Sequence, residues 1–90
     1  MDIIVEHNPK RAQLDALGVF DWPVWEKGIS RFDWTYDTRE ACYITAGTVT
    51  VTPAVGVPVT LTVGDYVTFP AGMACVWDIT EPISKHYQFG

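Results

Sequence analysis

A carboxylate, a thiol and several aromatic side chains are the groups with which this 90-residue chain could bind or transform a small molecule. Glu40 can accept a proton or anchor a polar ligand. Trp34 and Tyr36 alternate along a predicted strand, so both side chains point to the same side. The Cys75 thiol is a candidate nucleophile, but it needs an activating base or cation, because a thiol with a pKa of about 8.5 is mostly protonated at neutral pH. Glu40 and Cys75 are therefore the candidate catalytic residues.

Two neighbouring residues are candidates for activating this thiol. Lys85 and His86 are adjacent, so on a strand they face opposite sides, and at most one of them lines the interior. The sequence leaves open which one. Cys42 shares its parity with Glu40, so we expect it to face inward and count it among the ligand-binding residues. With only Cys42 and Cys75, the chain is not a disulfide scaffold, although a bond between them is conceivable.

Composition excludes several classes of partner. The chain carries 11 acidic and 6 basic residues, which gives a formal charge of −5, and no Lys/Arg cluster occurs. Nucleic acid and anionic membrane surfaces are therefore not expected as partners. Hydrophobic residues make up 48% of the chain, but no apolar run approaches the roughly 20 residues of a membrane span. We expect one cytoplasmic domain with a small-molecule partner.

The N-terminal segment 1–18 is predicted to hold a strand and a short helix. Asn8 can cap the helix, Pro9 suits its first position and Gly18 suits its end. The apolar residues 3–5 could add to the sheet of a neighbouring molecule. We therefore expect this segment to precede the main domain, which spans residues 19–90.

The remainder of the chain has the pattern of an all-β domain. Short apolar runs are separated by Gly, Pro, Asp or Thr, and two of them alternate at period two. Gly47, Gly64 and Gly72 are expected where strands reverse. The predicted strands are Val19–Trp25, Arg31–Tyr36, Ala41–Ile44, Thr48–Thr52, Val59–Val63, Tyr66–Phe69, Ala74–Ile79 and Lys85–Phe89.

Two glycine-framed segments have spacings that resemble the two motifs of the cupin superfamily. The first runs Gly28, five residues, Trp34, one residue, Tyr36, three residues, Glu40, six residues, Gly47. The second runs Gly64, five residues, Pro70-Ala-Gly72, two residues, Cys75. The chain also resembles small single-domain cupins of the branch named after ureidoglycine aminohydrolase, in segments 32–37, 40–43, 64–70, 75–77 and 85–87. The resemblance implies a single cupin jelly-roll barrel with a short N-terminal helical segment, and a homodimer.

The resemblance also implies where a metal would be held. Metal-binding cupins place His at the positions of Trp34 and Tyr36, Glu at Glu40 and a third His at Cys75. Only the carboxylate remains here. An indole has no lone pair for a metal, and a phenol binds one only after losing a proton of pKa about 10. No cofactor is therefore expected. A divalent metal held by Glu40, Tyr36 and Cys75 is the chemically conceivable alternative.

Three functions are compatible with these residues. The first is a metal-free pocket for a small polar metabolite, with Glu40 as its anchor. The second is a hydrolase or aminohydrolase of the ureidoglycine type that uses Glu40 and Cys75, with or without a metal. The third is a structural or interaction barrel that aromatic side chains fill completely. The predicted ligand-binding residues are Trp34, Tyr36, Glu40, Cys42, Cys75 and Trp77.

Overall fold

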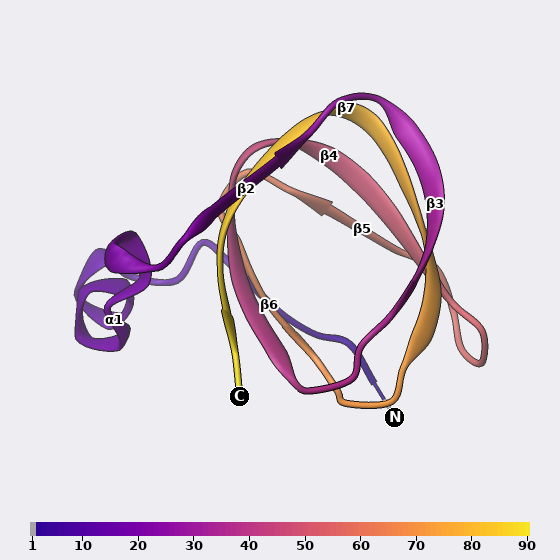
Figure 1. The fold of residues 1–90 in the computed structure, drawn as a ribbon. Coiled ribbons are helices and arrows are strands. Elements are labelled where there is room, and N and C mark those ends of the chain that lie inside the picture. Colours follow the sequence, from indigo (N-terminus) through magenta and orange to yellow (C-terminus); the bar gives the residue numbers. More distant parts are fainter. Residues whose placement is uncertain (1) are drawn as a thin grey trace.

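Antiparallel strands curl around a common interior, and one short helix lies outside them (Figure 1). The structure is a computed structural model, and it describes residues 2–90. Its elements are β1 (Ile4–His7), α1 (Arg11–Leu17), a 3-10 turn (Val19–Asp21), β2 (Val24–Lys27), β3 (Ser30–Thr35), β4 (Glu40–Pro53), β5 (Val59–Thr62), β6 (Asp65–Phe69) and β7 (Ala74–Phe89). The prediction of an all-β fold with a short N-terminal helical segment is confirmed.

Two long strands, β4 and β7, form the centre of the sheet. The described strands follow the order β1-β6-β4-β7-β2, with β5 added to β4 and β3 added to β7. β4 and β7 pair from Glu40 opposite Phe89 to Pro53 opposite Cys75. β1 pairs with β6 of its own chain, with Val5 opposite Val67. Ile4 and Val5, two of the apolar residues 3–5, therefore pair within the chain's own sheet.

β4 is one strand where the sequence predicted two. Ala41–Ile44 and Thr48–Thr52 both lie in it, so the expected reversal at Gly47 is wrong. The pairing with β7 instead shifts register around this glycine, as in a β-bulge. Gly47 has φ of 87°, and a Cβ there would lie 2.1 Å from the carbonyl oxygen of Pro82. The glycine lets the strand bend where β7 approaches closely.

This bulge changes which side chains of β4 face the interior. Before it, Glu40, Cys42 and Ile44 are buried, whereas after it Val49 and Val51 are buried. Side chains alternate along a strand, so an irregularity of one residue exchanges the two faces. The bulge therefore allows β4 to direct buried side chains into the interior on both sides of Gly47.

β7 is likewise one strand where the sequence predicted two. The predicted strands Ala74–Ile79 and Lys85–Phe89 both belong to it.

The predicted strand Val19–Trp25 is wrong in its first half, which forms the 3-10 turn instead. The N–H groups of Asp21 and Trp22 donate to carbonyls only three residues back, which closes a turn and prevents extension.

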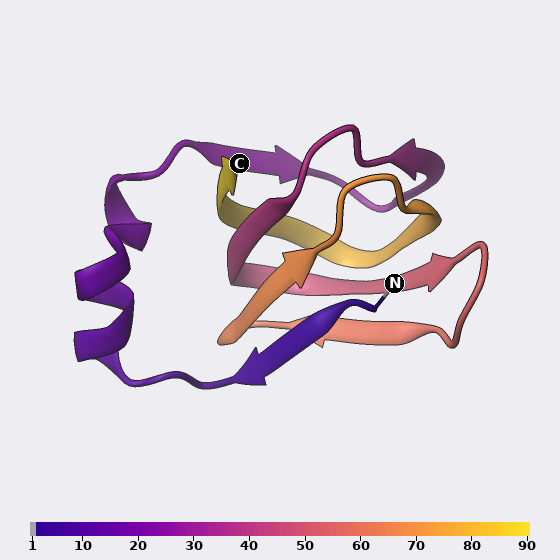
Figure 2. The ribbon, with the colours of Figure 1, turned by 90° about the horizontal axis from the view of Figure 1, so that it is seen from below.

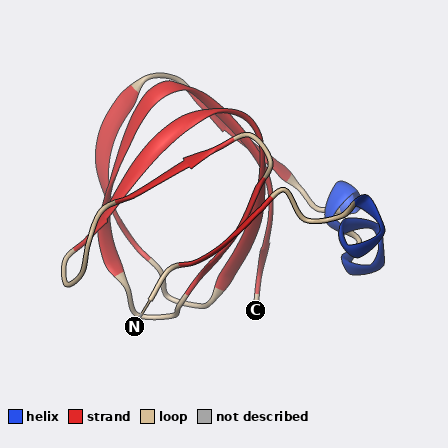
Figure 3. Cartoon of the chain, turned by 180° about the vertical axis from the view of Figure 1, so that it is seen from behind, coloured by secondary structure: helices blue, strands red, loops and turns tan. Residues whose placement is uncertain are grey.

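The helix begins later than predicted. Asn8 does not cap it: its own N–H donates to the carbonyl of Gly64, at 2.9 Å, and its φ is 49°. Lys10 is the residue at the N-cap, and its side chain makes no capping bond. Gly18 ends the helix in the left-handed conformation, as predicted. Figures 2 and 3 show α1 to one side of the strands. No helix within residues 2–90 is long and apolar enough to cross a membrane.

Candidate functional site

An aromatic cavity of about 200 Å³ lies between β2, β3, β4 and β7. Two of its walls, Trp34 and Phe89, are about half exposed, so they mark its mouth. Its floor carries the charged residues Glu40 and Lys85. The lining residues are Trp25, Phe32, Trp34, Tyr36, Glu40, Trp77, Lys85, Tyr87 and Phe89.

The two charged residues of the cavity form a buried ion pair. Lys85 Nζ lies 2.6 Å from Glu40 Oε2, and the two side chains are only 7% and 3% exposed. Charges at this depth are costly unless they are paired and hydrogen-bonded, because burial removes their hydration. The ion pair with Lys85 therefore explains how the Glu40 carboxylate is accommodated inside the barrel.

Aromatic rings complete the surroundings of the ammonium group. Lys85 Nζ lies 5.0 Å from the ring centroid of Trp25 and 4.7 Å from that of Trp77. The negative faces of such rings attract a cation, most strongly where water is excluded. Lys85 is therefore fixed by one carboxylate and two indole rings.

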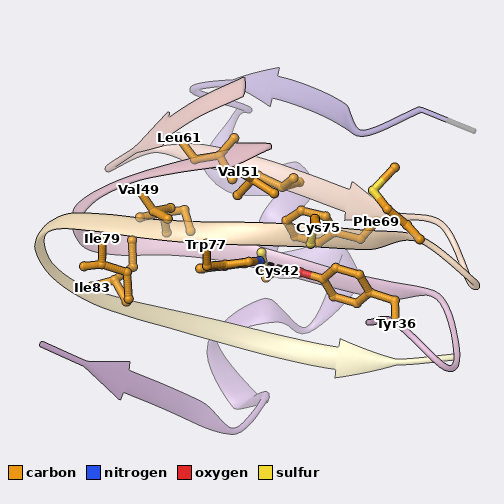
Figure 4. Close-up of a cluster of buried hydrophobic side chains, with 13 residues drawn as sticks. Tyr36, Cys42, Val49, Val51, Leu61, Phe69, Cys75, Trp77, Ile79 and Ile83 are labelled. Carbon is orange, nitrogen blue, oxygen red and sulfur yellow. Dashed lines mark hydrogen bonds between the residues drawn. The ribbon is translucent and has the colours of Figure 1, made fainter. Parts of the chain in front are cut away.

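Tyr36 is held as a neutral hydroxyl. Its oxygen accepts a hydrogen bond from Trp77 Nε1 at 3.2 Å, and its ring stacks on Phe69 at 4.6 Å (Figure 4). Burial raises the pKa of Tyr36 far above its usual value, and the negative charge of Glu40 raises it further. Tyr36 thus serves as a wall of the cavity and can offer a ligand a hydroxyl group.

Both cysteines are free thiols that lie in the hydrophobic core beside the cavity. Burial is the main cause that raises the pKa of Cys42, to about 12. It also raises the pKa of Cys75, whose Sγ donates to the Trp34 carbonyl at 3.6 Å. Neither thiol is therefore activated as a nucleophile in this arrangement.

The structure brings together four of the predicted site residues and separates two. Trp34, Tyr36, Glu40 and Trp77 line the cavity, whereas Cys42 and Cys75 are absent from its described walls. The lining residues that sequence reasoning did not assign to the site are Trp25, Phe32, Lys85, Tyr87 and Phe89.

The structure also resolves which of the two neighbouring basic residues faces inward. Lys85 does, while His86 packs edge-on against Phe20 and donates from Nδ1 to the carbonyl of Trp22 at 3.0 Å. A signal for this was present in the sequence. Lys85 shares its parity with the apolar Ile83 and with Tyr87, and an apolar row on a strand indicates its buried face.

The four positions that correspond to cupin metal ligands do not fit a metal ion. Trp34 offers no lone pair, the Tyr36 hydroxyl is kept protonated, Cys75 is a protonated thiol, and Glu40 is paired with Lys85. Within residues 2–90, no group of three or more His, Cys, Asp or Glu side chains gathers as a metal site would require. Glu40, Lys85 and Tyr36 are among the polar side chains that line the cavity.

Comparison with known proteins places this geometry in a family. The model of the EutQ-like cupin domain matches residues 14–87. A DUF861 family protein from Thermotoga maritima has a crystal structure that matches with a TM-score of 0.95 and 45% identity, over 99% of this chain and 100% of that chain. No protein of curated function matches.

More distant structures share the fold. The EutQ protein of Clostridium difficile matches with a TM-score of 0.67 and 23% identity, over 73% of this chain and 52% of that chain. A DUF1255 protein from Acidithiobacillus ferrooxidans matches with a TM-score of 0.67 and 14% identity, over 70% and 60% of the two chains. The cupin fold expected from the two motif spacings is thereby confirmed, and the chain belongs to the EutQ-like cupin family.

Proposed function

We propose that the aromatic cavity binds a small polar molecule that has a flat, apolar part, and that it does so without a metal. The observation that carries the proposal is the buried Glu40–Lys85 pair, which opens onto a cavity walled by aromatic rings. Ligand sites typically combine apolar walls with a few convergent polar groups.

The ion pair offers a ligand both kinds of hydrogen bond. Glu40 uses Oε2 for Lys85, so its Oε1 can accept from a ligand, and the ammonium has further N–H groups to donate. A group with a donor beside an acceptor, such as an amide or a urea, matches this pair. Tyr36 lines the same cavity, and its hydroxyl adds another polar group.

The volume of the cavity limits the size of the ligand. About 200 Å³ corresponds to roughly seven liquid waters at ~30 Å³ each. This is below the ~300–1,000 Å³ of pockets for drug-sized molecules. We therefore propose a metabolite of one ring or a short chain.

A thermal-shift screen of small amides, ureas, amino acids and carboxylates, followed by calorimetry, tests this proposal. We expect a ligand whose stabilising effect is lost in Trp34→Ala and weakened in Glu40→Gln. Lys10→Met is the matched control, because Lys10 is exposed and is not among the residues that line the cavity. If no compound raises the melting temperature of the wild type, the proposal is wrong.

Turnover by the same cavity is the alternative that the resemblance to the ureidoglycine aminohydrolase branch raises. Glu40 and Lys85 are the groups in the cavity that could exchange protons with an amide. Ammonia release from ureidoglycine-type compounds above the rate in buffer, lost in Glu40→Gln, would establish hydrolysis. Release equal to that in buffer alone would leave binding as the function.

Self-association in the cytoplasm is the remaining expectation. Among the strands of residues 2–90, β1 pairs with β6 alone, and Ile4 in β1 is 65% exposed. An unpaired strand edge can add to the same edge of a second copy. Light scattering on purified protein should therefore give twice the mass of one chain, and the mass of a monomer would contradict this.

A further inference from the structure

We infer that Lys85 can bind a small aldehyde or ketone covalently, as a Schiff base, with Glu40 transferring the protons. This rests on the proposed function, because it uses the same cavity, and it names the chemical class of the ligand. The geometry that supports it is a buried amine, a carboxylate at hydrogen-bond distance and a cavity beside both.

The surroundings of Lys85 differ from those of the other two lysines. Lys10 and Lys27 are exposed, whereas the side chain of Lys85 is 7% exposed and borders the cavity. Lysines that form Schiff bases are typically desolvated in hydrophobic pockets, because water no longer stabilises the ammonium over the nucleophilic amine. Lys85 shares the burial and the apolar surroundings of such lysines, and it has in addition a carboxylate partner that can accept its proton.

Glu40 is placed to receive the proton that the ammonium must lose. Its Oε2 lies 2.6 Å from Nζ, within the range for direct proton transfer. The freed nitrogen lone pair then attacks the carbonyl carbon, and the electron pair of the C=O bond moves to oxygen. Glu40 returns its proton to this oxygen.

Loss of water completes the reaction without any further reactant. Glu40 takes a second proton from nitrogen and passes it to the hydroxyl oxygen. The C–O bond then breaks as water departs, and the nitrogen lone pair forms the C=N bond. In sum, an ammonium and a carbonyl compound become a protonated imine and one water, with no change in net charge or oxidation state.

The cavity stabilises the product as well as the starting ammonium. The protonated imine keeps one positive charge at the position of Nζ. Glu40 remains its counter-ion, and the rings of Trp25 and Trp77 remain close enough to attract it. Apolar walls around this charge also limit the access of water that would hydrolyse the imine.

Benzaldehyde is a suitable probe, because an apolar cavity of ~150 Å³ is already large enough for benzene. Wild-type protein is incubated with benzaldehyde and sodium cyanoborohydride at neutral pH, which reduces an imine to a stable amine. Peptide mapping by mass spectrometry then locates the adduct. We expect labelling of Lys85 to be faster than that of Lys10 and Lys27 by about tenfold or more.

The exposed lysines serve as controls within the same molecule, so the test does not depend on a variant that folds. Labelling confined to Lys10, Lys27 or the N-terminal amine would overturn the inference. In Glu40→Gln we expect labelling of Lys85 to slow by about 100-fold, since general acid–base catalysis contributes ~10²–10⁴-fold. Unchanged labelling in a folded Glu40→Gln would remove Glu40 from this role.

Benzyl alcohol separates this inference from the proposed function, because it has the same ring and no carbonyl group. Benzyl alcohol that raises the melting temperature, together with no labelling of Lys85 by benzaldehyde, would leave the binding site intact and overturn the Schiff base. If benzyl alcohol and the wider library have no effect and Lys85 is not labelled, both proposals fall.

Discussion

Lys85 Nζ lies 2.6 Å from Glu40 Oε2, so the chain supplies its own cation to the carboxylate at the one cupin ligand position that it retains. The partners come from neighbouring central strands, since Glu40 begins β4 and Lys85 lies in β7. The same two residues therefore stabilise the interior and line the candidate site, because each buried charge is compensated by the other.

Removing one partner of this pair should destabilise the protein. Lys85→Met leaves Glu40 as an uncompensated buried charge, which typically costs about 3–5 kcal/mol. Replacing both, with Glu40→Gln and Lys85→Met together, should recover part of the loss because no isolated charge remains. Denaturant unfolding measures both effects. A loss for Lys85→Met no larger than that for the exposed Lys27→Met would contradict the assignment.

The protein should contain far less than one metal ion per chain when it is purified without a tag or a chelator. The reason is that the residues at the cupin ligand positions do not fit a metal. Elemental analysis measures the content, and addition of a chelator should leave the melting temperature unchanged. Near-stoichiometric metal that is lost in a Glu40→Ala, Cys75→Ser double variant would show that these residues do hold a metal.

Stability should fall as the pH rises above about 9. The Cys42 thiol would ordinarily lose its proton near pH 9, but burial raises its pKa to about 12 in the folded protein. Between these values the unfolded chain binds fewer protons than the folded one, so rising pH favours unfolding. Cys42→Ala should flatten this decline in the free energy of unfolding. Equal slopes for the wild type and the variant from pH 9 to 12 would contradict it.

Gly47→Ala should be much more harmful than Gly28→Ala. At Gly47 a side chain must adopt the left-handed conformation, which costs about 1–2 kcal/mol, and its Cβ must also displace the backbone at Pro82. At Gly28 a Cβ meets no atom within 4 Å. Thermal unfolding of the two variants tests the difference, and similar melting temperatures would show that the bulge tolerates a side chain.

Trp34→Ala should impair ligand binding and leave the fold almost unchanged. Trp34 is 47% exposed at the mouth of the cavity, whereas Trp77 is 2% exposed and donates to Tyr36. Truncation of a buried tryptophan costs about 3–5 kcal/mol, so Trp77→Ala should destabilise strongly. Calorimetry and unfolding measured on both variants separate the two roles. Strong unfolding of Trp34→Ala would show that it belongs to the core.

The architecture was predicted correctly because the spacings of the two glycine-framed segments match those of the cupin motifs. The prediction did less well at β4, since a glycine with positive φ has the same sequence signature in a turn and in a bulge. Only the approach of Pro82 to Gly47, which is distant in sequence, distinguishes the two. The boundaries of β4 could therefore not be predicted from the residues next to Gly47 in the sequence.

The candidate site was predicted in part for a related reason. Trp34, Tyr36 and Glu40 share one motif, so their proximity follows from local spacing. Lys85, the partner of Glu40, is 45 residues away along the chain. Predicting it required knowing whether Lys85 or His86 faces the interior. The apolar parity of Ile83 and Tyr87 would have favoured Lys85.

β7, which spans Ala74–Phe89, has a consequence for biosynthesis. It is the last strand in the sequence, yet β4, β2 and β3 all pair with it. During translation, residues 24–53 must therefore wait without their central partner until residue 89 has left the ribosome. Such long-range pairing slows folding and prolongs the exposure of unpaired edges. This domain is thus expected to complete its sheet only after β7 has been synthesised.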